Sequence, residues 1–179
     1  MSIRASIGMV IASLLMISCS LSTEAELARC TLVLPDLTLV NAEYVLKDEE
    51  SEPIAIQAAE ISLFDKTNTA NLSRLTFTQR DGEGTILVSG RADAAVANTK
   101  EWDAQLSGNV EITDYRNDFV ITADELSWLH KQQLITAPAN QLVTIVYTND
   151  KRVEGYGLDG NLKNSTFTFD RIVSGAFSL

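Results

Sequence analysis

Apolar and polar residues alternate along almost the whole chain from residue 31 onward. Successive side chains of a β-strand point to opposite faces, so this period of two indicates strands with one buried and one solvated face. Polar turn sequences separate the alternating segments, and many short strands joined in this way predict an all-β roll, sandwich or barrel. The alternation is clearest over 37–46, 74–79, 85–96, 104–113, 142–148 and 164–170.

The chain also contains an internal repeat. IAIQAAEISL (54–63) and FVITADELSW (119–128) start 65 residues apart and share four identical residues at matched positions. In both segments every second residue is apolar, and this alternation is shifted by one position once, after Ala58 and after Ala123. We call this change a parity shift. One extra residue exchanges the two faces of a strand, so we predict a strand, a β-bulge and a second strand in each copy.

Two further pairs of segments extend the repeat. LVSGRADA matches RVEGYGLD, which starts 65 residues later, and LVNAEYV matches LSGNVEI at a slightly different offset. The chain therefore divides into two related units of about four strands each, which must pack on one another to bury their apolar faces. These pairs lie at 87–94 and 152–159, and at 39–45 and 106–112.

The first 18 residues have the layout of an export signal, with Arg4, an apolar run over 7–17 and the small Ser18 before Cys19. The run is shorter than the roughly 20 residues that span a bilayer as a helix. Met16-Ile17-Ser18-Cys19 resembles a bacterial lipobox, although Leu is more usual where Met16 stands.

We therefore predict a lipoprotein-type signal peptide over 1–18, a linker over 19–30 and a β-domain over 31–179. Cys19 is the expected lipidation site, and its acyl chains would hold the protein at a membrane surface. Plain secretion and an uncleaved anchor are the alternatives. Cys30 then has no intramolecular disulfide partner and is expected to be a small apolar residue, or else to form an intermolecular bridge.

Candidate catalytic groups are scarce. The net charge is −10 and the basic residues are scattered, which disfavours nucleic acid as a partner. The single histidine, His130, has no cysteine or acidic cluster nearby that suits a metal, and no nucleophile elbow occurs. The candidate paired carboxylates are Glu60, Glu125 and Asp124. Glu60 and Glu125 occupy equivalent repeat positions, which favours a structural or surface role over paired acid–base work. We predict a non-enzymatic protein without metal or cofactor.

The apolar faces of the strands form either a closed core or an open trough able to hold acyl chains. Both arrangements bury the same residues, so the pattern leaves the choice open. The expected lining residues are Phe77, Val110, Ile112, Phe119, Ile121, Trp128, Val143, Ile145, Phe167 and Phe169.

Three short motifs in order resemble the LptC family of lipopolysaccharide-export proteins, within the wider OstA/LptA-like group. They are an L-x-G-x-V-x-[IV] strand, an A-[DE]-x-[AL] strand and a late G-x-G-[LF]-x-[GA]-x-L stretch. The matching residues are Leu106, Gly108, Val110 and Ile112, then Ala123, Asp124 and Leu126, then Gly155, Gly157, Leu158 and Leu162.

The resemblance implies a twisted, open β-jellyroll that carries the acyl chains of lipopolysaccharide, or of a similar glycolipid, in a hydrophobic trough. It implies a place at the inner membrane facing the periplasm. The N-terminal strand edge would join an ABC transporter permease, and the C-terminal edge would join an OstA/LptA-like protein by strand addition. Many members keep an uncleaved N-terminal helix, whereas this chain is expected to use a lipid on Cys19.

A surface lipoprotein with a carbohydrate-binding jelly-roll is the alternative function, and it would need exposed aromatics on one face. Tyr44, Trp102, Tyr115 and Tyr156 are the candidates, but they do not line up on one predicted strand face.

Gly90, Gly108 and Gly155 stand at comparable places in the apolar rows of the repeat. We interpret them as structural glycines that permit either a sharp local twist or the close approach of a backbone or an acyl chain. On the second interpretation Gly108→Val impairs function more than stability. A variant that fails to fold would assign Gly108 to the twist.

Overall fold

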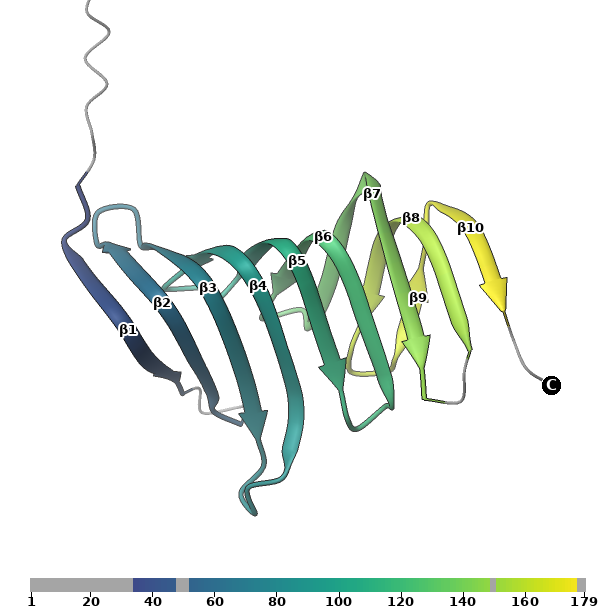
Figure 1. Cartoon of the computed structure of the whole chain (residues 1–179), viewed down its shortest axis with the longest axis horizontal. Coiled ribbons are helices and arrows are strands. Elements are labelled where there is room, and N and C mark those ends of the chain that lie inside the picture. The colour runs from purple at the N-terminus through teal and green to yellow at the C-terminus, as the bar shows by residue number, and fades with distance from the viewer. Residues whose placement is uncertain (1–33, 48–51, 149–150, 177–179) are drawn as a thin grey trace, which may run out of the picture. The chain divides into compact units, whose positions relative to one another are not determined.

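The computed structural model describes residues 34–47, 52–148 and 151–176. These residues form one antiparallel sheet in which the strands follow one another in chain order, so the all-β prediction is confirmed (Figure 1). The predicted signal peptide, the linker, Cys19 and Cys30 lie outside the described residues. The strands are β1 (Leu37–Leu46), β2 (Ile54–Phe64), β3 (Thr69–Arg80), β4 (Ile86–Asn98), β5 (Ala104–Asp114), β6 (Phe119–Leu129), β7 (Leu134–Tyr147), β8 (Arg152–Asn161), β9 (Thr166–Thr168) and β10 (Arg171–Ala176).

Each of the six clearest predicted segments overlaps a strand of the structure. The segment 74–79 is the second half of β3, and 142–148 covers the second half of β7, so these two strands are longer than predicted. Sequential hairpins explain the topology, because each polar turn returns the chain beside the strand it has just left. At the far side β9 and β10 both pair with β8, one with each half of it.

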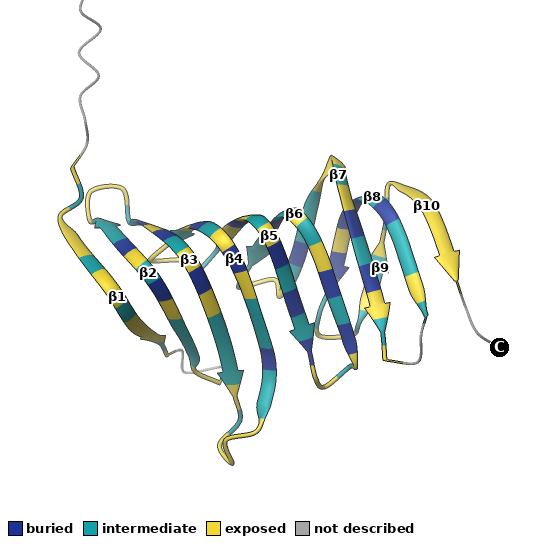
Figure 2. Cartoon of the chain, in the orientation of Figure 1, coloured by how far each residue is buried: buried dark blue, intermediate teal, exposed yellow. Residues whose placement is uncertain are grey.

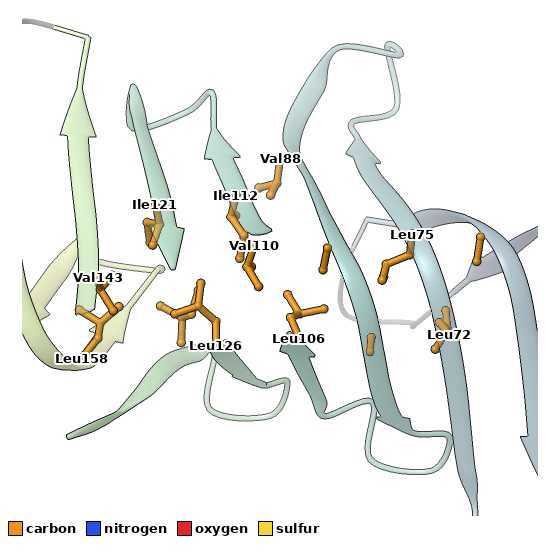
Figure 3. Packing of buried hydrophobic residues seen from close by; sticks show 14 of the residues in the cluster. Leu72, Leu75, Val88, Leu106, Val110, Ile112, Ile121, Leu126, Val143 and Leu158 are labelled. Carbon is orange, nitrogen blue, oxygen red and sulfur yellow. The ribbon is translucent and has the colours of Figure 1, made fainter. Parts of the chain in front are cut away.

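Most strands bend near the middle and bury both halves in the same interior. Buried residues of an unbent strand are two apart, but in β3 the buried Leu72 and Leu75 are three apart. The same step separates the buried Ala92 and Ala95 in β4. After the bend the opposite parity faces inward, and the sheet folds over one hydrophobic cluster drawn from β2 to β8 (Figures 2 and 3).

The predicted parity shift in the two repeat copies is confirmed, but the bulges are not in those strands. In β2 the buried residues step from Ala58 to Ile61, yet its register with both neighbours is unbroken. Ser107 and Val110 of β5 are three residues apart, but their partners on β6 are only two residues apart. The extra residue therefore lies in β5, and the corresponding insertion on the other side of β6 lies in β7.

Gly108 is placed at the β5 bulge. Gly108 and Asn109 both have positive φ, 73° and 47°. A Cβ on Gly108 would lie 2.6 Å from Oδ2 of Asp93, and the Asn109 side-chain amide donates a hydrogen bond of 2.6 Å to the same oxygen. Because the neighbour of Gly108 is the exposed carboxylate of Asp93, this geometry favours the twist over a contact with an acyl chain.

Gly90 and Gly155 instead accommodate phenyl rings of a neighbouring segment. A Cβ on Gly90 would overlap the ring of Phe77, its cross-strand partner, and would lie 2.7 Å from the carbonyl oxygen of Glu111. A Cβ on Gly155 would lie 2.6 Å from Cγ of Phe169. The two glycines therefore have the same role at equivalent positions of the repeat, since each lets an aromatic ring pack against the strand backbone.

Hydrogen bonds join the turns after β2, β4, β6 and β8 into a row, which we call the first turn row. The Thr99 amide donates to the Asn68 carbonyl oxygen at 2.9 Å, and the His130 amide donates to Oδ1 of Asp103 at 2.8 Å. The Leu162 amide donates to the Gln133 carbonyl oxygen at 3.2 Å. These bonds hold successive hairpins in register along one side of the sheet.

We expect Gly108→Ala to lower the free energy of unfolding by about 1–2 kcal/mol, because an L residue is strained at positive φ and its Cβ meets Asp93. Gly82→Ala is the matched control, since φ is ordinary there and nothing lies within 4 Å of the added Cβ. Urea denaturation of both variants measures the difference. Equal stability of the two variants would contradict the twist role.

Candidate functional site: an apolar hollow in the N-terminal half of the sheet

An apolar hollow of about 520 Å³, partly open to solvent, lies inside the folded sheet. Its wall comes mainly from aliphatic side chains of β2 to β5, completed by residues of β1, β6 and β7. The hollow falls within the size range of small-molecule sites, and its lining suits an apolar ligand. The main apolar lining residues are Ile56, Ile61, Leu63, Leu72, Leu75, Phe77, Leu87, Val88, Leu106, Ile112, Leu126, Trp128 and Ile135.

Small side chains account for the empty space. Ala70, Ala95, Ala97 and Ala104 all line the hollow, and Ala95 is only 3% exposed. A buried alanine fills less volume than the valine, leucine or phenylalanine usual in a core, so a group of them leaves room between the two halves of the bent strands.

The C-terminal half of the same interior is closed. Phe119, Ile121, Val143 and Ile145 are at most 1% exposed, and none of them lines the hollow. The Phe119 ring lies edge-on to Tyr147 and Phe167, with centroid distances of 5.9 and 5.1 Å. Burial raises the pKa of the Tyr147 phenol above its usual value, as expected beside an apolar cluster.

The predicted lining residues therefore divide into two groups. Phe77, Ile112 and Trp128 line the hollow. The others belong to the closed part: Val110, Phe119, Ile121, Val143, Ile145, Phe167 and Phe169. The interior thus combines a partly open hollow with a part in which the side chains are fully buried.

Sequence reasoning missed the hollow's wall in β2 and β3, including Ile56, Leu63 and Leu72. These residues alternate as ordinary core residues do, so their own pattern carries no sign of empty space. The alanine-rich segment at 92–97 was the available signal, because strands that face a packed core rarely present so many small side chains inward.

Polar groups line the hollow at both ends. Asn98, Thr99, Trp102, His130, Gln133 and Lys163 belong to the first turn row and its flanks, while Glu52, Gln79 and Arg116 lie at the opposite ends of the strands. Arg116 bonds to the buried carboxylate of Asp114 at 3.0 Å, so its charge is compensated there. Asp114 also accepts the backbone amides of Arg116 and Asn117, which builds the β5–β6 turn.

The candidate acidic groups form no catalytic pair. Glu60 accepts the Ser62 hydroxyl at 3.2 Å on β2, and Glu125 accepts the Gln105 amide at 2.6 Å on β6. Within residues 34–47, 52–148 and 151–176, no group of three or more His, Cys, Asp or Glu residues is placed to hold a metal ion. The same residues include no helix long and apolar enough to cross a membrane.

The two outer strands each have one unpaired edge in the described part of the chain. β1 pairs only with β2, and β10 pairs only with β8. Both strands carry exposed hydrophobic side chains, among them Val40 at 67% and Ile172 at 66% exposed (Figure 2). Unpaired backbone beside exposed apolar side chains is a template for adding a strand from another chain.

Glu154 holds β10 against the rest of the sheet. Its carboxylate accepts hydrogen bonds from Arg152, from the Ser174 hydroxyl of β10 at 2.7 Å and from the Thr144 hydroxyl of β7 at 3.3 Å. The Arg152 bond, followed by the Ser174 bond, lowers the pKa of Glu154 below its usual value. One side chain thus joins three successive strands at the C-terminal edge.

Comparison with known proteins gives a family that agrees with this geometry. The profile of the family described as "Lipopolysaccharide-assembly, LptC-related" matches residues 9–177. The chain belongs to the LptC family. The resemblance found in the sequence is thereby confirmed, and membership makes the protein a component of lipopolysaccharide transport.

A solved structure shows the same fold. LptH from Pseudomonas aeruginosa, described as the LptA-homologous periplasmic component of the lipopolysaccharide transport device, superposes with a TM-score of 0.53 at 14% identity. The match covers 67% of this chain and 83% of LptH, and it confirms the open OstA-like β-jellyroll. No curated protein sequence matches the chain. Members of the LptC family are transport proteins, and they are periplasmic components of the lipopolysaccharide transport machinery.

We expect Ala95→Leu to weaken the binding of an apolar dye such as anilinonaphthalene sulfonate, with less than about 1 kcal/mol lost in stability, because the added group enters empty space. Ala123→Leu is the control, because the half-buried Ala123 packs against the core cluster without lining the hollow, and overpacking there is expected to cost about 1–3 kcal/mol. Dye titration and urea denaturation measure the two effects. Similar destabilisation by both changes would contradict the difference between the halves.

We expect Glu154→Gln to speed hydrogen exchange of the β10 amides at neutral pH, since the neutral amide loses the charged bonds to Arg152 and Ser174. A carboxyl whose pKa is lowered by folding stabilises above its unfolded pKa, about 4.3 for glutamate, and that contribution disappears as the pH falls through the folded pKa. The exchange rates of the β10 amides in the wild type should therefore approach those of the variant only at acidic pH.

Glu111→Gln is the control for this measurement, because Glu111 pairs with Arg91 on an exposed face of β4 and β5 and does not contact β10. Exchange rates are compared after correction for the intrinsic effect of pH. Unchanged β10 exchange in Glu154→Gln at neutral pH would show that Glu154 does not hold the edge.

Proposed function

We propose that this LptC protein receives lipopolysaccharide, or a similar glycolipid, from an inner-membrane ABC transporter and passes it to a periplasmic OstA/LptA-like protein. The observation that carries the proposal is the apolar hollow, enclosed by the sheet between two strand edges that are unpaired in the described residues. The hollow would hold the acyl chains, and the sugars would remain in water.

Burial of acyl chains supplies the binding energy in this proposal. Each methylene removed from water contributes about 0.8 kcal/mol, and the wall of the hollow is formed mostly by aliphatic carbon. No covalent step is needed to move a lipid between two apolar sites. The lack of a catalytic pair or a metal cluster among the described residues is compatible with such non-enzymatic transfer.

The two edges would provide the junctions with the neighbouring proteins. We propose that the β1 edge joins the transporter permease and that the edge formed by β9 and β10 joins the OstA/LptA-like partner. Strand addition would supply backbone hydrogen bonds, and exposed residues such as Val40 and Ile172 would supply apolar contact. A continuous sheet would let the apolar interior of one protein adjoin that of the next.

We further propose that the protein faces the periplasm and is held at the inner membrane by a lipid on Cys19. The composition of residues 1–18 and the lipobox-like sequence support this anchor. Acyl chains on Cys19 would keep the β-domain close to the transporter.

The positions of the four candidate aromatics do not favour a surface carbohydrate module. Tyr44 lies on β1, Trp102 in the β4–β5 turn and Tyr115 in the β5–β6 turn. The Arg171 guanidinium covers Tyr156 at 4.3 Å from the ring centroid. Tyr44, Tyr115 and Tyr156 therefore offer no common exposed platform for a sugar chain.

We expect a photo-crosslinking residue at Phe77 to capture glycolipid in cells, because Phe77 lines the hollow. Thr76 is the control: it is the preceding residue on β3, is exposed and does not line the hollow. Lipid adducts are detected by mass change and by antibody to the glycolipid. Adducts at both positions, or at neither, would contradict transport through the hollow.

A further inference from the structure

The two tryptophans and the one histidine of the chain lie together at one mouth of the hollow. The His130 ring is near both indoles, with centroid distances of 5.4 Å to Trp102 and 6.3 Å to Trp128. Trp102 belongs to the β4–β5 turn, Trp128 to the end of β6, and His130 to the turn that follows. All three side chains are half-buried, so each has a face within the hollow's lining and a part in solvent.

Trp102 has a backbone conformation that is unusual for a large residue, with φ at +65°. Four other turns in the sheet use the same left-handed conformation, and they place Asn68, Asp118, Gln133 and Ser165 there, with φ between 52° and 55°. Small or polar residues tolerate positive φ much better than bulky ones. The turn itself does not require tryptophan, since it is built by Asn98, whose carbonyl accepts the Trp102 amide at 2.8 Å. The side chain of Trp102 therefore needs a separate explanation.

Acidic groups stand beside this mouth but outside the lining of the hollow: Asp103 accepts the His130 amide, and Glu101 pairs with Lys131. The chain carries a net charge of −10, yet no carboxylate lines the hollow at the first turn row, where Lys163 and the Gln133 amide are lining groups. Within the described residues Lys163 makes no ion pair. Aromatic faces beside donor groups suit a ligand that presents a C–H surface together with hydroxyls or acidic substituents.

We propose that Trp102, His130 and Trp128 form a subsite for the sugar ring adjoining the acyl chains of a bound glycolipid. The apolar face of the sugar packs on the indole of Trp102, and its outward groups bond to Gln133 and Lys163. The acyl chains extend into the hollow, so the subsite fixes the headgroup at the first turn row. This inference rests on the proposed function, because it assumes an acylated ligand in the hollow.

The competing explanation is that Trp102 only covers the end of the apolar interior. The variant Trp102→Asn distinguishes this explanation from the proposed subsite. Asparagine is favoured at positive φ, so this change relieves the backbone. A purely structural cap predicts lower stability and equal loss of affinity for every amphiphile. The proposed subsite predicts stability that is unchanged or higher, with a loss confined to ligands that carry a sugar.

The experiment measures binding of two amphiphiles with the same tail to the purified full-length protein, each below its micelle concentration. Dodecyl maltoside carries a sugar head, and dodecyl octaethylene glycol ether does not. Calorimetry gives the affinities, and tryptophan emission reports directly on the subsite because both tryptophans lie in it. Tyr115→Asn is the control, since Tyr115 is an exposed turn aromatic that does not line the hollow.

We expect wild type and Tyr115→Asn to bind the maltoside about threefold to tenfold more tightly than the ether, as one stacking contact would give. We expect Trp102→Asn to lose that preference while keeping its affinity for the ether. Equal binding of both amphiphiles by wild type would overturn the subsite and leave the lipid hollow standing. Failure of wild type to bind either would overturn the proposed function and the subsite together. Binding of tail-free maltose with the same affinity as dodecyl maltoside would also overturn the inference.

Discussion

The reversal of faces in the middle of the strands is the constraint on which the rest of the structure depends. A straight strand buries one parity along its whole length, and a sheet of such strands needs a second layer to cover it. Here β3 buries Leu72 before its bend and Leu75 after it, so the two halves of one sheet cover each other. Strand β5 adds a bulge at Gly108 and Asn109, and β7 adds an insertion, which adjust neighbouring strands to the same bend.

The sizes of the inward side chains then decide how each half of the interior is used. Where Ala70, Ala95 and Ala97 face inward, the two layers leave a hollow of about 520 Å³. Where Phe119, Ile121 and Ile145 face inward, the side chains are at most 1% exposed and do not line that hollow. One apolar surface is therefore continuous from β2 to β8, but only its N-terminal part is open in this conformation.

An open sheet has a cost that a barrel avoids, since it leaves two unpaired edges with exposed apolar residues. Among the residues that the structure describes, those edges belong to β1 and β10, where the proposed function places the junctions with neighbouring proteins. The hydrogen bonds that Glu154 accepts from β7 and β10 hold the outer strand against the rest of the sheet. The first turn row, with its aromatic cluster, gives the hollow a polar mouth on one side of the sheet.

The sequence by itself determined the strand class, the parity shifts, the repeat and the family. Each of these depends on residues close in the chain, because alternation, turn chemistry and short motifs are local properties. Only the tertiary structure decided that the extra residue lies in β5, that Gly108 faces Asp93, and that Phe77 lines a hollow while Phe119 does not. Those outcomes depend on the pairing register and on the volumes that meet across the bend. The residues involved are far apart in the chain, and alternation cannot distinguish a filled interior from an empty one.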